Sequence, residues 1–202
     1  MEIRHSKNLE NDFRQEICLP ENGRQFAECL IFADQMPKTF DLTIRLLGRA
    51  SRAELVILYL GGNKDEADMK ITLAHEAPET YGRVVIKAAL FDESRLTVRG
   101  MLEIAPNARG ADSYLLAKAL LVSPHARAEI YPYLEIATDE VKASHGTSVG
   151  RIDEKQLFYL QSRGVEQDKA KELLLAGFFR DLAKDFSRKD QEKFFQYAAE
   201  QL

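Results

Sequence analysis

Cysteine is scarce in this 202-residue chain, which contains only Cys18 and Cys29. The two do not form a C-x-x-C pair, and two thiolates cannot complete a four-thiolate metal centre. We therefore expect structural thiols, and no disulfide in a reducing compartment.

Several other features are missing. No apolar run approaches the ~20 residues that span a bilayer, and the polar start Met1–Ser6 lacks the apolar core of a signal peptide. No G-x-x-x-x-G-K phosphate loop, H-x-H or H-E-x-x-H spacing occurs. The 28 basic and 32 acidic side chains leave a net charge of −4, so there is no electrostatic footprint for nucleic acid. These absences predict a cytoplasmic protein that does not itself hydrolyse ATP through such a loop.

Short strands fill the chain from about Phe40 to Val149. Residues 41–46 and 70–75 alternate polar and apolar side chains, whereas residues 55–60 are almost wholly apolar. The tetrapeptide Leu-Glu-Ile-Ala occurs at 102–105 and again at 134–137, 32 residues later. Evenly spaced strands and this internal repeat favour a β-solenoid, and an antiparallel sandwich remains the alternative.

The pattern becomes helical after Gly150. Asp153 is a good N-cap and Gly164 a natural stop, which predicts a helix over 154–163. A second helix is expected over about 166–186, and a third after Ser187. The apolar stripe expected for the second helix comprises Ala170, Leu173, Leu174, Gly177, Phe178 and Leu182. We predict a β body over 1–150, with its first ~20 residues peripheral, and a helical tail over 151–202.

The tail is rich in aromatic side chains. A solenoid needs a covered end, so we expect several of them to pack against the end of the β body and cap it. The aromatic residues of the second and third expected helices are Phe178, Phe179, Phe186, Phe194, Phe195 and Tyr197.

Residues 144–164 read SHGTSVGRIDEKQLFYLQSRG. This segment resembles the signature at the C-terminal end of the SufB/SufD family of iron–sulfur cluster assembly scaffold proteins. In that family a Ser-His-Gly strand leads into a helix of the form Asp-Glu-x-x-Leu-Phe-Tyr-Leu-x-Ser-Arg-Gly. The resemblance extends more weakly upstream, through residues 100–104, 120–123 and 133–136. It implies a right-handed parallel β-helix with a small helical tail, in a chain shorter than full-length members.

The departures from the family pattern make the chain SufD-like. Ser144 and Gly146 stand where SufB-type sequences carry acidic residues, and there is no cysteine around Leu116 to Leu120, where SufB-type sequences carry the cluster-building one. Ala143 stands where SufD-type sequences often have cysteine. The resemblance thus implies a non-enzymatic scaffold with no tightly bound cofactor, which holds iron or an iron–sulfur cluster only transiently.

His145 is the candidate ligand, because imidazole binds iron and carries protons near neutral pH. The alternative is a histidine that only hydrogen-bonds a turn. We expect it to be accessible, with Lys142 and Glu135 nearby. Because side chains alternate along a strand, Lys142 and Ser144 should point to one face, and Ala143 and His145 to the other.

The resemblance also implies two partners. The first is an ABC-type ATPase like SufC, docked on the helical tail. The second is a SufB-like scaffold subunit, or a second copy that forms a homodimer through residues 134–145. The candidate ATPase-binding residues are Leu157, Phe158, Tyr159, Arg163, Leu173, Leu174 and Phe178.

Two alternatives stay open. A small β-helix enzyme acting on polysaccharide would use clustered carboxylates, for which Asp92-Glu93 and Asp139-Glu140 are candidates. A stand-alone solenoid homodimer without an assembly role is the other. His75 and His125 lie beside carboxylates but not at the spacing of a metal site.

Overall fold

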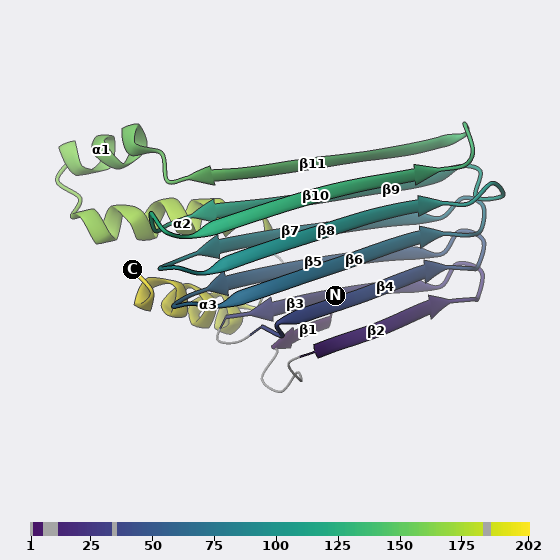
Figure 1. Ribbon diagram of the computed structural model, residues 1–202, viewed down its shortest axis with the longest axis horizontal. Helices are drawn as coiled ribbons and strands as arrows, with labels where there is room; N and C mark the ends of the chain where they lie inside the picture. The colour runs from purple at the N-terminus through teal and green to yellow at the C-terminus, as the bar shows by residue number, and fades with distance from the viewer. Residues whose placement is uncertain (1, 6–11, 34–35, 184–186) are drawn as a thin grey trace.

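The computed structural model describes residues 2–5, 12–33, 36–183 and 187–202. Within them, successive strands alternate between two sheets, and three helices follow (Figure 1). The six-stranded sheet contains β1 (Glu2–His5), β3 (Gln25–Phe32), β5 (Arg52–Gly61), β7 (Tyr81–Leu90), β9 (Ala111–Leu121) and β11 (Val141–Arg151). The five-stranded sheet contains β2 (Asp12–Leu19), β4 (Thr39–Leu46), β6 (Glu66–His75), β8 (Arg95–Ile104) and β10 (Arg127–Ile136). The helices are α1 (Glu154–Ser162), α2 (Gln167–Ala183) and α3 (Arg188–Glu200).

Every described strand pair is parallel, so each coil of the chain stacks on the coil before it. In Figure 1 the five-stranded sheet runs to the right in front and the six-stranded sheet returns behind it while the chain climbs, which makes the coil right-handed. The two Leu-Glu-Ile repeats lie in register, with Leu102 beside Leu134 and Ile104 beside Ile136. The right-handed parallel β-helix predicted from the sequence is confirmed, and the antiparallel sandwich is wrong.

The corners of the coils stack as regularly as the strands. Ala50 and Glu79 occupy the same corner in successive coils, and both have left-handed backbones, with φ of 56° and 59°. Each donates its backbone N–H to the next coil, Ala50 to Pro78 O and Glu79 to Arg109 O. Gly110 repeats the geometry one coil later, with φ of 73°, where glycine adopts this conformation without strain.

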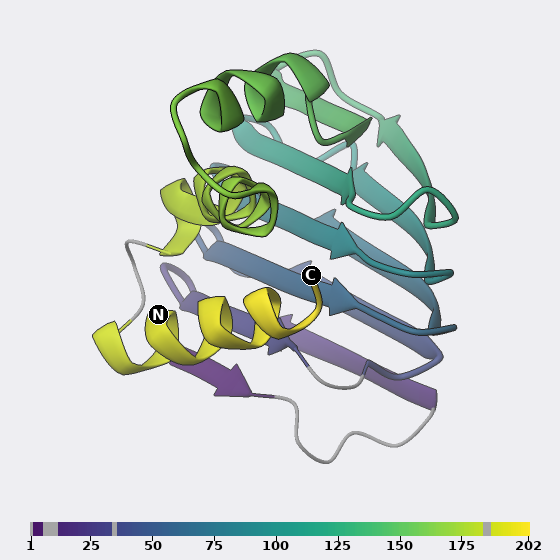
Figure 2. The ribbon, with the colours of Figure 1, turned by 90° about the vertical axis from the view of Figure 1, so that its left-hand side faces the viewer.

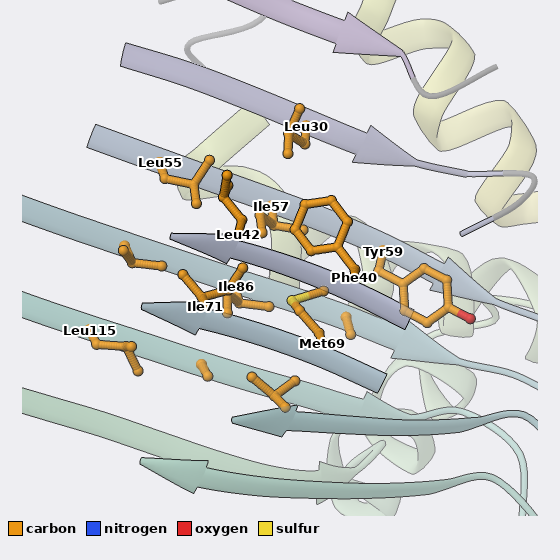
Figure 3. Packing of buried hydrophobic residues seen from close by; sticks show 14 of the residues in the cluster. Leu30, Phe40, Leu42, Leu55, Ile57, Tyr59, Met69, Ile71, Ile86 and Leu115 are labelled. Atoms are coloured by element: carbon orange, nitrogen blue, oxygen red, sulfur yellow. The ribbon is translucent and has the colours of Figure 1, made fainter. Parts of the chain in front are cut away.

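The main core lies between the two sheets, as Figure 3 shows for a set of inward-facing side chains. The period-2 pattern of the strands supplies it: along β4, alternate residues from Phe40 to Leu46 are at most 1% exposed. The inward rows from successive strands stack on one another, because the strands are in parallel register.

A second apolar layer covers the outer face of the six-stranded sheet. Helices α2 and α3 lie against this face (Figure 2), where Phe179 and Phe194 pack on Leu58 and Val85. The expectation that the aromatic tail caps the end of the β body is therefore wrong, because β5 and β7 offer apolar side chains on both faces. Phe186 lies outside the described residues.

One charged contact anchors α2 to this face. Lys87 of β7 has a side chain only 6% exposed, and its ammonium donates to Phe178 O at 2.6 Å and to the Asp181 carboxylate. The ammonium also lies 5.1 Å from the centroid of the Phe178 ring. These contacts compensate the desolvation of a buried charge, so Lys87 fixes the position of α2 on the sheet.

The helix limits were largely predictable. Asp153 caps α1, accepting from the backbone N–H of Lys155 at 2.8 Å, and Gly164 follows its end with φ of 84°. Ser187 caps α3. The stripe predicted for α2 is partly wrong, because Leu173 is exposed while Leu175 and Phe179 are buried in its place. Three consecutive leucines, 173–175, leave the helical phase ambiguous.

The last strand ends at Arg151 and α1 begins at Glu154. No helix of the described ranges has both the length and the apolar character that crossing a bilayer requires.

Replacing Phe179 should strongly destabilise the protein. Its ring is fully buried and lies 4.9 Å from those of Phe178 and Phe194, so Phe179→Ala should lower the free energy of unfolding by about 3–5 kcal/mol. Phe158→Ala is the matched control, because that ring is 72% exposed and its loss should cost about 0.5 kcal/mol or less. Urea denaturation measures both, and equal losses would show that α2 does not pack as described.

Candidate functional site

His145 lies on the inner face of the last coil. Its register partner on β9 is Leu115, which points into the core and is 1% exposed. Side chains alternate along a strand, so Ala143 and Thr147 share the inward face with His145, whereas Ser144 points outward. His145 is nevertheless exposed, because none of the described strands stacks beyond β11. Its predicted accessibility is confirmed.

The last coil presents an uncovered cross-section of the core. Leu134 of β10 is 40% exposed, and Val149 of β11 is 43% exposed. Their register partners one coil earlier, Leu102 and Ala119, are 0% and 3% exposed. His145 therefore lies at the exposed apolar end of the core rather than on a polar surface. We call this end, which includes Leu134, His145 and Val149, the mouth.

Neither of the expected polar neighbours shares the face of His145. Glu135 is on the outward face of β10, and Lys142 is on the outward face of β11, as the alternation of side chains along β11 predicts for Lys142. The reason is that both are an odd number of positions from inward-facing residues of their own strands.

The two cysteines also lie far from His145 in the fold. Cys18 is exposed on β2 in the first coil, and Cys29 is buried on β3 beneath the helices. Across the ranges that the structure describes, no three His, Cys, Asp or Glu side chains gather as a metal-ligand group. His145 thus offers a single imidazole as a donor.

The helical tail carries a separate exposed apolar surface. On α1, Phe158 and Tyr159 are 72% and 56% exposed, and on α2 Leu173 is 48% exposed. The guanidinium of Arg163 lies 5.2 Å from the Tyr159 ring centroid. Of the other residues predicted to bind a partner, Leu157 and Leu174 are half-buried, and Phe178 faces Lys87 of the sheet.

The candidate carboxylate pairs of a polysaccharide enzyme are not brought together. Asp92 and Glu93 lie in the corner between β7 and β8, whereas Asp139 and Glu140 lie in the corner between β10 and β11, at the opposite end of the strands. Asp92 accepts from the backbone N–H of Asn63 at 2.8 Å. These pairs do not form one catalytic cleft.

His75 has a structural role in the core. It is fully buried, with Nδ1 2.8 Å from Thr80 Oγ1 and Nε2 3.0 Å from Ser113 Oγ. Burial lowers the pKa of His75 from 6.5 to about 4, so the imidazole is neutral at pH 7. His125 lies on an exposed corner beside Arg127 and Arg95.

Sequence reasoning did not identify the exposed apolar mouth. The signal was present in the Leu-Glu-Ile-Ala repeat, since aligning the two copies stacks Leu134 on Leu102. The sequence contains no third copy of this repeat, and none of the described strands stacks on the second copy to cover it.

Comparison with known proteins supports the resemblance. Residues 32–178 match the family model described as "SUF system FeS cluster assembly, SufBD core domain". The chain is 35% identical over 147 residues to the iron-sulfur cluster assembly SufBD family protein ML0594 of Mycobacterium leprae. It is 31% identical over 140 residues to the family protein Rv1461 of Mycobacterium tuberculosis, and 30% identical over 140 residues to the chloroplastic family protein ABCI8 of Arabidopsis thaliana.

Each of these alignments covers 69% of the chain, but only 38%, 16% and 25% of the respective relatives. Residues 32–178, which match the family model, contain β4 to β11, with His145, and α1. The structure is a parallel β-helix, and the chain belongs to the SufBD family.

Lowering the pH should destabilise the protein through His75. The unfolded state binds a proton near pH 6.5 and the folded state only near pH 4, so between these values protonation favours unfolding. The free energy of unfolding should fall by about 3 kcal/mol across this window. Urea titrations at pH 7 and pH 4.5 measure the loss, and His75→Gln should remove much of the difference, whereas His145→Gln should leave it unchanged. An equal slope in all three proteins would contradict the assignment.

Proposed function

We propose that this chain is a non-enzymatic scaffold in iron–sulfur cluster assembly. It would receive iron or a nascent cluster as cargo at His145, in a compartment we expect to be the cytoplasm. The observation that carries the proposal is the position of His145: an accessible imidazole on the inner face of an uncovered last coil, within the matched family core.

In this proposal, two surfaces of the protein bind two different partners. The exposed side chains of α1 and α2 dock an ABC-type ATPase similar to SufC, and the mouth of the last coil receives a second scaffold chain. The names of the relatives, which refer to iron–sulfur cluster assembly, support the role. No group of three His, Cys, Asp or Glu side chains suited to a metal occurs among the residues that the structure describes, which supports a role for a second chain.

The ATPase changes shape as it binds and hydrolyses ATP, and the scaffold responds only if the tail binds the two ATPase states with different affinity. Because Lys87 holds α2 on β7, a force on the helix reaches the β body directly.

Docking should depend on the exposed tail residues. The double variant Phe158→Ala with Leu173→Ala removes two large exposed side chains that make no core contacts, so it should lose at least about tenfold in ATPase affinity while keeping its stability. Co-purification and titration calorimetry with a SufC-like ATPase from the same organism measure the loss. His145→Ala is the matched control and should bind normally. Unchanged binding by the double variant would place the docking site elsewhere.

His145→Ala should impair cluster delivery without destabilising the fold. An exposed histidine leaves no buried group unpaired, so the melting temperature should stay within about 2 °C of the parent protein. Complementation of a strain lacking the scaffold, with aconitase activity as readout, measures delivery. A large loss of melting temperature with normal delivery would identify a turn-bonding histidine instead.

A further inference from the structure

Several basic side chains of the β body pair with a carboxylate of a neighbouring coil. Arg49 Nη2 lies 2.5 Å from Glu79 Oε1, and the Arg99 guanidinium of β8 contacts the Asp68 carboxylate of β6. Opposite charges on adjacent strands attract each other, so these contacts help to hold neighbouring coils together. One corner of the last coil departs from this pattern.

Like charges adjoin where β10 begins. Arg127 is the register partner of Arg95 on β8, and both side chains are exposed on the outward face of the five-stranded sheet. Adjacent strands lie about 4.8 Å apart, so the two guanidinium groups share one small area of the surface. This arrangement is unfavourable unless another group compensates the charges.

A third guanidinium reaches the corner that joins β9 to β10. Arg151, the last residue of β11, donates from Nη2 to Pro124 O at 3.1 Å. Arg127 donates from Nη1 to the same oxygen at 3.2 Å and to Ala126 O at 3.0 Å. Because both arginines bind one carbonyl oxygen, their guanidinium groups lie close together.

Two of the neighbouring carboxylates are engaged by other groups. Glu93, in the corner between β7 and β8, lies 3.7 Å from Lys64 Nζ. Glu129 of β10 accepts a hydrogen bond from the Tyr131 hydroxyl at 2.7 Å. Both carboxylates therefore already have a partner that is not one of the three arginines.

The third neighbouring carboxylate does not compensate the arginines either. Glu66 of β6 is the register partner of Arg95, but the two side chains form no ion pair. Among the residues that the structure describes, no carboxylate forms an ion pair with Arg95, Arg127 or Arg151. The corner thus carries three positive charges without a counter-charge.

A hollow lies beside this corner. Arg95, Arg127, His125 and Glu93 line a volume of about 330 Å³. His125 is exposed, and within the described ranges neither its imidazole nor the Arg95 guanidinium makes a hydrogen bond. Two guanidinium groups and an imidazole therefore border one space with donors to spare.

We propose that this hollow, bounded by Arg95, His125 and Arg127, binds a phosphate group. A phosphate group carries about −1.5 to −2 charges at pH 7, which balances two guanidinium groups. Its oxygen atoms point in tetrahedral directions and can accept from three side chains at once, whereas the two oxygens of a carboxylate lie in one plane. The planar fork of arginine suits such contacts.

The size of the hollow admits two sources of the phosphate group. Its volume equals that of about eleven water molecules in the liquid, so a free phosphate ion or the monoester of a small alcohol fits. Glu93 on the rim can accept a hydrogen bond from a hydroxyl group of such an ester. Both sources present the same charged group to Arg95 and Arg127.

An anion in the hollow would stabilise the last coil at its junction with the helical tail. It would replace the repulsion between Arg95 of one coil and Arg127 of the next with attraction to a shared group. Arg151 is two residues before Asp153, the N-cap of α1, and the corner lies at the end of the strands from which α1 departs (Figure 1). The inference is independent of the proposed scaffold role.

Titration of the whole chain with inorganic phosphate tests the site. Backbone amide NMR signals of Arg95, His125 and Arg127 should shift in a saturable manner, with a dissociation constant of about 1 mM or tighter. Sodium chloride at the same ionic strength should not reproduce these shifts, because it screens charges without bridging them.

Arg95→Gln is the decisive variant, because the Arg95 side chain has no partner in the described structure and its loss leaves no group unpaired. Phosphate affinity should fall about tenfold or more while the melting temperature in the absence of phosphate stays unchanged. Arg95→Lys keeps the charge but not the planar fork, and should lose about threefold.

Arg99→Gln is the matched control. Arg99 lies on the same outward face of β8, but its charge is already paired with Asp68. Its replacement should leave phosphate affinity within about twofold of the parent value.

Glycerol 1-phosphate, titrated in the same way, distinguishes the two sources. Tighter binding of this monoester would identify an esterified phosphate as the ligand. Tighter binding of inorganic phosphate would identify the free ion.

Two results would overturn the inference. One is a set of shifts around Arg95 that sodium chloride reproduces at equal ionic strength, and the other is an Arg95→Gln variant that binds phosphate as the parent does. Neither result bears on the proposed scaffold role, because the titration involves no ATPase and no cluster.

Discussion

Backbone hydrogen bonds between successive coils are the constraint on which this structure depends. Each strand takes its register from the strand one coil earlier, and all described pairs are parallel. The stacked left-handed corners at Ala50 and Glu79 keep that register from coil to coil. Stacked coils necessarily end in two strands with a neighbour on one side only, and in this chain one of those strands carries His145.

The two faces of the six-stranded sheet serve different purposes. Its inner face forms the main core, and its outer face binds the helices through Val85, Leu58 and their neighbours. Burying Lys87 in this outer layer is unfavourable unless its ammonium is satisfied, and Phe178 O and Asp181 satisfy it. Helices α2 and α3 therefore belong to the same packed body as the coils, while Phe158 and Tyr159 of α1 and Leu173 of α2 remain exposed.

Much of the fold could be predicted from the sequence because its signals are local. Strand alternation, the caps Asp153 and Ser187, and the Leu-Glu-Ile-Ala repeat each depend on neighbouring residues or on one simple offset. The resemblance around His145 supplied the handedness and the candidate ligand. The remainder depends on three-dimensional packing. A tail rich in phenylalanine fits the end of a solenoid as well as its side, and only the apolar outward residues of β5 and β7, seen together, decide for the side. The face that Glu135 occupies likewise depends on the register of β10 with β8, whereas strand alternation already predicts that Lys142 and His145 point to opposite faces of β11.

The uneven burial of the coils has a consequence for folding and local opening. In β10 and β11 no side chain is fully buried, whereas the rows of β5 and β7 are nearly all buried. Amide protons of the last coil should exchange fastest among the long strands, because that coil can detach without disturbing the coils beneath it. The coil that bears His145 is thus less stable than the central coils, and binding a partner there would change its protection more than theirs.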